Sequence, residues 1–197
     1  SITTGTGNNA YGIFNDGAYN TTTVSGSIKT AGFFANGIRN DGNYNNTTLS
    51  GSITTGNDTY AYGIYNLGDS NTTTVSGSIA TTGVNSRGII NIGDSNTTTV
   101  SGSIATTGSA ASGIFIDGNN NTTTFSGSIK TEGAGAYGIS NGGDNNTTTV
   151  SGSIETTGEN SYGIVLGKGT GSPDTTTISG TVKATGAGSA ALLISSG

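Results

Sequence analysis

The sequence predicts an all-β fold: a parallel β-solenoid with a triangular, three-sided coil, about 7.5 coils of about 25 residues, forming one domain over residues 1–197. Apolar residues recur at three fixed places in each repeat, and within each segment they alternate with a period of two. One repeat has too few apolar residues to form a core alone, so the copies are expected to stack. Ser-Gly pairs mark the period, in steps of 25, 26, 25, 25, 25 and 28 residues, at Ser25, Ser50, Ser76, Ser101, Ser126, Ser151 and Ser179.

Each repeat is predicted to contain three short strands, because the recurring apolar residues are mostly β-branched. Stacking would turn each recurring position into a column of like residues spaced about 4.8 Å apart, and the whole stack would be about 36 Å long. Around the Ser-Gly pair, one side of the chain is expected to carry Thr22, Val24, Gly26 and Ile28. The first column is Val24, Leu49, Val75, Val100, Phe125, Val150 and Ile178; the second is Ile2, Ile28, Ile53, Ile79, Ile104, Ile129, Ile154 and Val182; the third is Ile13, Ile38, Ile64, Ile89, Ile114, Ile139, Ile164 and Leu192.

Two asparagine columns accompany the apolar ones. The first shares its position with Ile116 and Leu166, so it is expected to face inward as a ladder in which each amide bonds the next: Asn15, Asn40, Asn66, Asn91 and Asn141. The second precedes the threonine run and is expected to shape a turn with left-handed backbone: Asn20, Asn45, Asn71, Asn96, Asn121 and Asn146, ending at Asp174. A glycine column is expected to mark the same turn: Gly17, Gly42, Gly68, Gly93, Gly118 and Gly143. The segment near 167–174, which holds Pro173, is predicted to be an insertion loop.

Composition excludes several classes of function. The formal net charge is −5 and only six residues are Lys or Arg, which argues against nucleic-acid binding. No apolar run is long enough to span a membrane, so no membrane insertion is expected. The chain has no Cys, which rules out disulfides and thiol metal sites. It starts without Met or a signal peptide, so we expect a processed product or an excised fragment.

No catalytic set is recognisable, so the chain is not expected to be an enzyme. His and Cys are both absent, which removes the usual base and thiol nucleophile. Asp69 and Asp94 share a column on neighbouring coils, with Asn119 and Asp144 further along. That column is interpreted as a turn position, a shallow Ca²⁺ site or acidic pair being the alternative; no other cofactor is expected. A carbohydrate-active β-helix remains a minor alternative that sugar-release assays would test.

The threonine run is predicted to form a contact face. If Thr22 and Val24 point inward, the residues on either side of Thr22 point outward, and only Asn46 interrupts the series. Two parallel ranks of Thr resemble the ice-binding face of β-solenoid antifreeze proteins, although Thr also simply suits exposed strands. The outward residues are Thr21, Thr23, Thr72, Thr74, Thr97, Thr99, Thr122, Thr124, Thr147, Thr149, Thr175 and Thr177.

A tyrosine column is a second candidate surface. Tyr11, Tyr62, Tyr137 and Tyr162 share one position, which holds Asn36, Arg87 and Ser112 in the other coils. Such a stripe would stack on sugars or on a neighbouring molecule, or it would pack at a corner of the coil.

The segment "AYGIYNLGDSNTTTVSGSI" resembles the repeats of bacterial autotransporter passenger domains and related surface proteins, and the resemblance covers essentially the whole chain. It implies a right-handed parallel β-helix displayed outside the cell, often as an adhesin. We therefore expect a non-catalytic extracellular or cell-surface rod, with ice binding as the alternative. The expected partners are other copies of the chain, end to end or laterally, and host or surface glycans. Neither end of the sequence looks capped, which is the basis for expecting end-to-end stacking.

Overall fold

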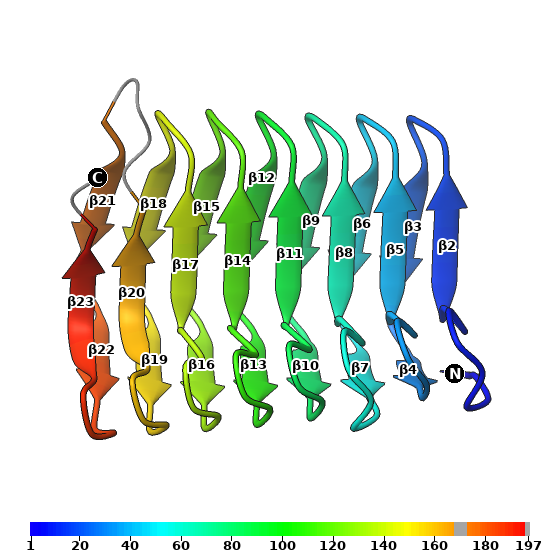
Figure 1. Ribbon diagram of the computed structural model, residues 1–197. Coiled ribbons are helices and arrows are strands. Elements are labelled where there is room, and N and C mark those ends of the chain that lie inside the picture. Colours follow the sequence, from blue (N-terminus) through cyan, green and yellow to red (C-terminus); the bar gives the residue numbers. More distant parts are fainter. Residues whose placement is uncertain (168–172, 196–197) are drawn as a thin grey trace.

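The computed structural model describes residues 1–167 and 173–195, and within these residues it contains 23 strands and no helix. Within the same residues, nothing helical has the length and apolarity to cross a bilayer. The chain rises along the front strands, passes over the top, descends along the back strands and advances from right to left (Figure 1), which makes the coil right-handed. The predicted parallel β-solenoid is therefore confirmed, including its handedness.

Three parallel sheets form the sides of the coil, with eight, eight and seven strands. The first sheet comprises β1 (Ile2–Thr3), β4 (Ser27–Thr30), β7 (Ser52–Thr55), β10 (Ser78–Thr81), β13 (Ser103–Thr106), β16 (Ser128–Thr131), β19 (Ser153–Thr156) and β22 (Thr181–Ala184). The second sheet comprises β2 (Ile13–Asp16), β5 (Ile38–Asp41), β8 (Ile64–Leu67), β11 (Ile89–Ile92), β14 (Ile114–Asp117), β17 (Ile139–Gly142), β20 (Tyr162–Leu166) and β23 (Ala190–Ile194). The third sheet comprises β3 (Thr21–Val24), β6 (Asn46–Leu49), β9 (Thr72–Val75), β12 (Thr97–Val100), β15 (Thr122–Phe125), β18 (Thr147–Val150) and β21 (Thr175–Ile178).

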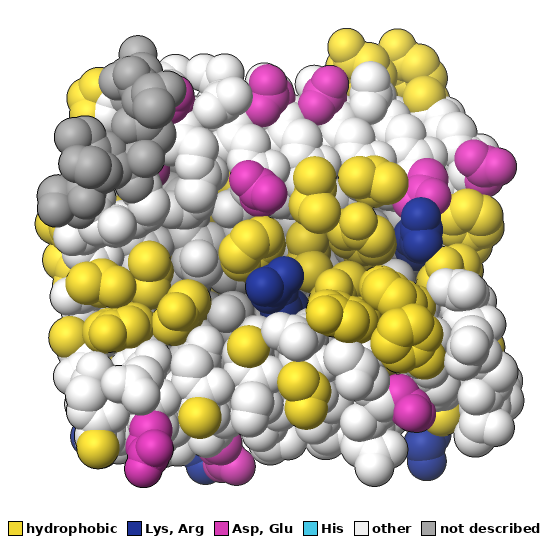
Figure 2. Space-filling view, in the orientation of Figure 1, with side chains coloured by type: hydrophobic (Ala, Val, Ile, Leu, Met, Phe, Trp, Pro, Cys, Tyr) yellow, Lys and Arg dark blue, Asp and Glu magenta, His cyan; other side chains and the backbone are white. Residues whose placement is uncertain are grey.

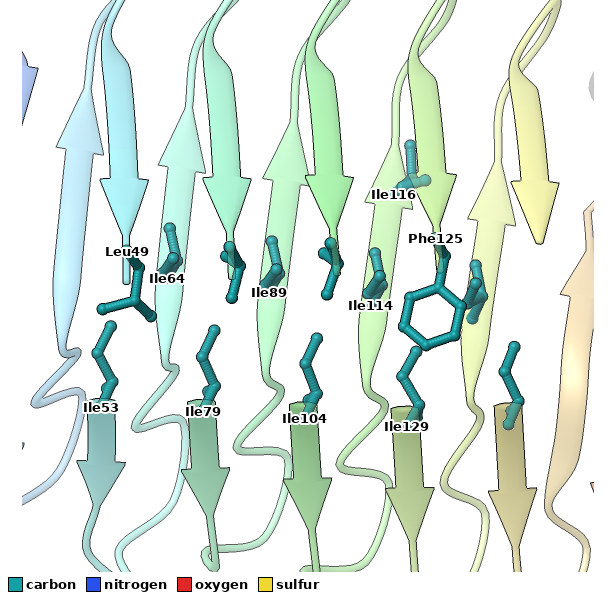
Figure 3. Close-up of a cluster of buried hydrophobic side chains, with 14 of the residues drawn as sticks. Leu49, Ile53, Ile64, Ile79, Ile89, Ile104, Ile114, Ile116, Phe125 and Ile129 are labelled. Carbon is teal, nitrogen blue, oxygen red and sulfur yellow. The ribbon is translucent and has the colours of Figure 1, made fainter. Parts of the chain in front are cut away.

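The register of every sheet joins equivalent positions of the repeat on successive coils, and at the inward positions these are mostly like residues. Thr97 pairs with Thr72 and Thr122, and Ile79 pairs with Ile104. All three apolar columns point into the coil, where they form one continuous core along the axis (Figure 3). The middle coils bury this core completely, whereas Ile2 and Leu192 in the terminal coils are 38 % and 42 % exposed. Burial of stacked β-branched side chains is therefore what drives the repeats together.

The predicted inward asparagine ladder is present. Asn15 Nδ2 donates to Asn40 Oδ1 at 2.6 Å, Asn40 to Asn66 at 2.7 Å, and Asn66 to Asn91 at 2.7 Å. Each amide nitrogen also donates to an inward threonine seven residues later; for Asn91 this partner is Thr98 Oγ1 at 2.7 Å. From Asn15 to Asn66, each amide thus has partners on its own coil and on the next coil, which offsets the cost of burying it.

Ile116 interrupts this ladder. It is buried in the place of the next asparagine and offers neither a donor nor an acceptor. As a result, Asn141 Oδ1 and Thr123 Oγ1 are buried without hydrogen-bond partners among the described residues. The interruption splits the polar ladder and leaves two unsatisfied atoms beside it, a cost of about 1–3 kcal/mol for each atom.

The turn between the second and third sheets differs from expectation in one respect. Its glycine column does adopt positive φ, from 101° at Gly143 to 149° at Gly118. The expectation that the second asparagine column is left-handed was wrong, because the residue before it takes that conformation, as at Ser70 and Ser95. The asparagines themselves accept backbone N–H groups across the coils, and Asn45 N donates to Asn71 Oδ1 at 2.8 Å.

The Ser-Gly pair is a corner rather than part of a continuous strand. The third-sheet strand ends at Val24, the next strand begins at Ser27, and Gly26 is exposed rather than inward. Backbone lies against this column from coil to coil: a Cβ at Gly102 would overlap the carbonyl oxygen of Gly77. Glycine at this corner is therefore required by close backbone approach.

Of the predicted insertion loop, residues 168–172 lie outside the described part of the chain.

Candidate functional site

The outer side of the third sheet, here called the threonine face, is a regular array of hydroxyl and methyl groups. Its two ranks are in register from β3 to β21, and Asn46 alone replaces a threonine within those strands. The alternate threonines, such as Thr98 and Thr123, are buried. Exposed or partly exposed side chains are found at all the predicted outward positions: Thr21, Thr23, Thr72, Thr74, Thr97, Thr99, Thr122, Thr124, Thr147, Thr149, Thr175 and Thr177.

The spacing on the threonine face follows from the strands. Neighbouring ranks on one strand are two residues apart, which is about 6.6 Å, and successive rungs are about 4.8 Å apart. The parallel register keeps both spacings constant from rung to rung. Chemically, such a face can order water or dock on another flat lattice, but it offers no charge and no strong nucleophile.

The outer side of the second sheet is different in kind. In the sequence, nine of the 13 Phe and Tyr residues fall in the segment from Tyr11 to Tyr65. On this face, hydrophobic groups gather around basic groups, which are dark blue in Figure 2. We call the part around Tyr62, Tyr65, Arg87 and Phe115 the aromatic face. Tyr62 packs edge-on against Tyr65, with ring centroids 5.4 Å apart, and Tyr62 is only 7 % exposed. These side chains belong to β8, β11 and β14 or to the segments just before them.

A small second core lies beneath this face. Ile90, on the outward side of β11, is nevertheless 1 % exposed, and its neighbours in the sheet are Tyr65 and Phe115. Burial raises the pKa of the Tyr62 phenol from 10.0 to about 12, and the charge of Arg87 partly opposes that rise. The aromatic face is therefore a packed platform rather than a set of free side chains.

Two aromatic residues next to this platform occupy unusual backbone. Phe34 and Tyr60 have φ of 55° and 60°, at a loop position where later coils place Asn85 and Ala110. Their rings stack with centroids 5.0 Å apart and an interplanar angle of 13°. A bulky residue in left-handed backbone costs about 1–2 kcal/mol, so the stacked pair is held against a local preference. Strain of this kind is common at functional surfaces.

The two arginines of the chain both lie on this side of the molecule, in contrasting environments. Arg39 on β5 is fully engaged: Nε and Nη2 donate to the two Asp41 oxygens at 2.7 Å each, and Nη1 donates to Tyr11 Oη at 2.8 Å. The hydrogen bonds to Asp41 raise the pKa of Arg39, against an opposing effect of burial. This guanidinium lies within 5.2–5.6 Å of the ring centroids of Tyr11, Phe14 and Tyr65.

Arg87 lacks a comparable partner. Its Cζ lies 3.9 Å from the centroid of Phe115, a stacked cation–π contact. Among the described residues its Nε is buried without a hydrogen-bond partner, and no carboxylate forms a salt bridge with it. Burial lowers the pKa of Arg87, while Tyr62, Tyr60 and Asp117 act in the opposite direction. Arg87 is thus a partly exposed cation with no side-chain hydrogen bond to any residue that the structure describes.

The predicted tyrosine column is only partly brought together. The rings of Tyr137 and Tyr162 contact each other, with centroids 5.6 Å apart. Tyr62 packs into the aromatic face, whereas the Tyr11 ring contacts the Arg39 guanidinium. Sequence columns revealed the Tyr and Arg positions but not Phe115 as the partner of Arg87. The signal that was missed is a second column, three residues after the tyrosine column. On successive strands it holds Phe14, Arg39, Tyr65, Ile90 and Phe115.

The acidic column acts as a turn position. Asp94 N donates to Asp69 Oδ1 at 2.8 Å, and Asn119 N donates to Asp94 Oδ1 at 2.7 Å. One oxygen of each carboxylate therefore accepts a backbone N–H from the next coil. No group of three or more acidic side chains suited to a metal ion is found among the described residues.

An open groove of about 520 Å³ follows the Ser-Gly corner, between the first and third sheets. Ser hydroxyls and backbone atoms line it, and none of its lining residues is charged.

Comparisons with protein families, with curated proteins and with solved structures found no match to this chain.

Proposed function

We propose that this chain is a stiff, non-catalytic structural element of an extracellular or cell-surface assembly. It would act as the shaft of an adhesin of the autotransporter-passenger kind or as a subunit of a self-assembled fibre. The observation that supports this is the unbroken register of three parallel sheets around one apolar core. The absence of His and Cys from the sequence, which leaves no usual base or thiol nucleophile, supports a non-catalytic role.

Stiffness follows from the way neighbouring coils are joined. Each inner coil bonds to the next through three backbone ladders and through the asparagine amides, as between Asn40 and Asn66. The eight strands of the first sheet span about 34 Å along the axis. Because each coil presents the same columns to its neighbour, such a stack lengthens by adding coils without any new kind of contact.

The fibre form of the proposal is tested by electron microscopy of the purified protein over a hundredfold range of concentration. Uniform fibres one solenoid wide, or laterally paired ones, are expected if copies associate. Single compact particles at every concentration would exclude the fibre form and leave only the shaft.

The shaft form is tested by pulling single molecules from both ends. A load-bearing stack should release one coil at a time. Each release should add about 83 Å of contour, which is about 25 residues at roughly 3.5 Å each less the rung spacing of about 4.8 Å. A single featureless extension at low force would contradict the proposal, because it would mean that the coils do not carry load together.

Ice binding is the second candidate, and the regular threonine face is the observation that favours it. Thermal hysteresis of the purified protein measures this activity directly. Thr122→Tyr would place a ring in the middle of the face and should abolish hysteresis. Ser140→Tyr is the matched control, because it adds the same ring on the second sheet, where Tyr65 already occupies that column. No hysteresis in the unaltered protein would exclude ice binding.

A further inference from the structure

We infer that the aromatic face binds a carbohydrate chain that carries carboxylate or sulfate groups, with Arg87 holding the oxyanion. The inference is independent of the rod proposal, since it concerns one face of a single molecule. It rests on three features of the described residues: an unpaired guanidinium, aromatic rings fixed around it, and the confinement of both to a few adjacent coils.

The unpaired guanidinium is the first feature. Arg39 shows what a satisfied arginine looks like on this surface, with both Asp41 oxygens bound at 2.7 Å. Arg87 is stacked on Phe115 at 3.9 Å in a similar aromatic setting but has no such partner, and its Nε is buried without one. A planar guanidinium pairs best with a planar or tetrahedral oxyanion in bidentate geometry. The missing partner is therefore expected to come from a ligand, whose oxyanion would bind the two Nη groups because Nε is buried.

The rings of the aromatic face are the second feature: Phe115 stacks directly on Arg87, and Tyr65 lies two strands away from Phe115. Tyr65 and Phe115 lie on β8 and β14, on either side of the strand that holds Ile90. The two rings are therefore on strands two rungs apart, about 9.6 Å, which is close to the length of two sugars in an extended chain. Aromatic rings offer apolar faces for the C–H side of a sugar, and Tyr hydroxyls reach a polar partner at the edge. Tyr62 and Tyr65 are held in place by their mutual packing at 5.4 Å, so little ordering remains to be done on binding.

The third feature is that the repeat does not need these side chains. At the position of Arg87 the next coil has Ser112, and at the position of Phe115 the next coil has Ser140. Both serines are compatible with the same backbone. A chain with a net charge of −5 does not attract polyanions through its overall charge. An acidic sugar would therefore have to be bound through local contacts on the aromatic face.

Binding is measured with the purified chain and three immobilised polysaccharides: a polyuronate, dextran sulfate and neutral dextran. The expected result is binding to at least one of the two acidic polymers and none to dextran; the preference between them identifies the oxyanion. Arg87→Ser, which copies Ser112, should weaken binding at least tenfold. Phe115→Ser, which copies Ser140, should also weaken it.

Tyr137→Ser is the matched control, because it changes the same column two coils further on and should leave affinity within twofold. Circular dichroism and unfolding midpoints establish that each variant is folded. The inference is overturned if neither acidic polymer binds, or if Arg87→Ser binds as well as the unaltered chain. It is also overturned if the substitution changes only self-association in sedimentation experiments, since the occupant of the face would then be a second copy of the chain.

Discussion

The threonine face and the aromatic face lie on the same coils, yet one repeats and the other does not. On the third sheet, Thr97 meets Thr72 and Thr122 on the adjacent strands. On the second sheet, the outward column changes from Tyr65 to Ile90 to Phe115 over the same coils. Duplication of the repeat cannot alone explain the sameness of the first face, because the same coils vary on the second. The difference teaches that outer columns of this solenoid are free to vary, so the regularity of the threonine face is not imposed by the fold.

The corner bordering the threonine face should be the least tolerant position, and Gly102→Ala tests this. The added Cβ would overlap the Gly77 carbonyl oxygen, which is backbone and cannot move aside. We expect a loss of about 3 kcal/mol or more in the free energy of unfolding. Gly142→Ala on the second sheet is the control, since its Cβ would have its nearest neighbour at 3.5 Å and should cost less than about 0.5 kcal/mol. Equal effects in urea unfolding would show that the corner is not constrained.

The aromatic face should make stability depend on alkaline pH. Tyr62 has a pKa raised to about 12 by burial, against 10.0 for an ordinary phenol. Between these values the unfolded chain has lost the proton and the folded chain keeps it, so stability falls as pH rises, by up to about 1.4 kcal/mol per pH unit. Below pH 10 this contribution is fully present.

Urea unfolding from pH 9 to pH 12 measures this dependence, with Tyr62→Phe as the control. The variant should lose most of the slope but not all of it, because burial also raises the pKa of Tyr65. An identical slope in both proteins would mean that Tyr62 is not buried as described.

Restoring the interrupted asparagine ladder inside the second sheet should have a smaller effect on stability, and it should stabilise the fold rather than destabilise it. Ile116→Asn would place an amide between Asn91 and Asn141 and next to Thr123, supplying partners for two buried unsatisfied atoms. The new hydrogen bonds should outweigh the lost apolar burial, with a net gain of about 1 kcal/mol. Differential scanning calorimetry of the variant and of Ile116→Val checks this. A loss as large as that of Ile116→Val would show that the ladder adds nothing there.

The smallest effect should come from the threonine face itself. Thr97→Asn copies Asn46, which already occupies this rank, and should change the free energy of unfolding by less than about 0.5 kcal/mol. Thermal unfolding beside the unaltered chain checks it. A loss above about 1 kcal/mol would mean that the threonine ranks support the fold, and their regularity would then say nothing about a contact surface.

The inward part of the structure could be predicted from the sequence because it depends on one period. An inward column must accept only residues that fit the core, so finding Asn66, Ile116 and Leu166 in one column predicts that it faces inward. The parallel register then places each asparagine one rung from the next, which the hydrogen bond between Asn66 and Asn91 confirms.

The corners and the aromatic face could not be predicted in this way. The column pattern does not show which residue of a turn adopts positive φ, and the prediction for the asparagines before the threonine run was wrong by one position. It also cannot show that Arg87 reaches across to Phe115, because that contact joins different columns on different coils. Long side chains on an outer face find their partners by direction and reach, which the period of the repeat does not contain.

Amide hydrogen exchange resolved coil by coil would test most directly whether the chain is one stiff stack. If it is, exchange is slowest in the middle coils, at β10, β11 and β12, with similar protection in all three sheets and a gradual decrease toward both ends. That pattern follows from the complete burial of Ile79, Ile89 and Val100. Protection of one sheet alone, or uniformly fast exchange in the middle coils, would contradict the account.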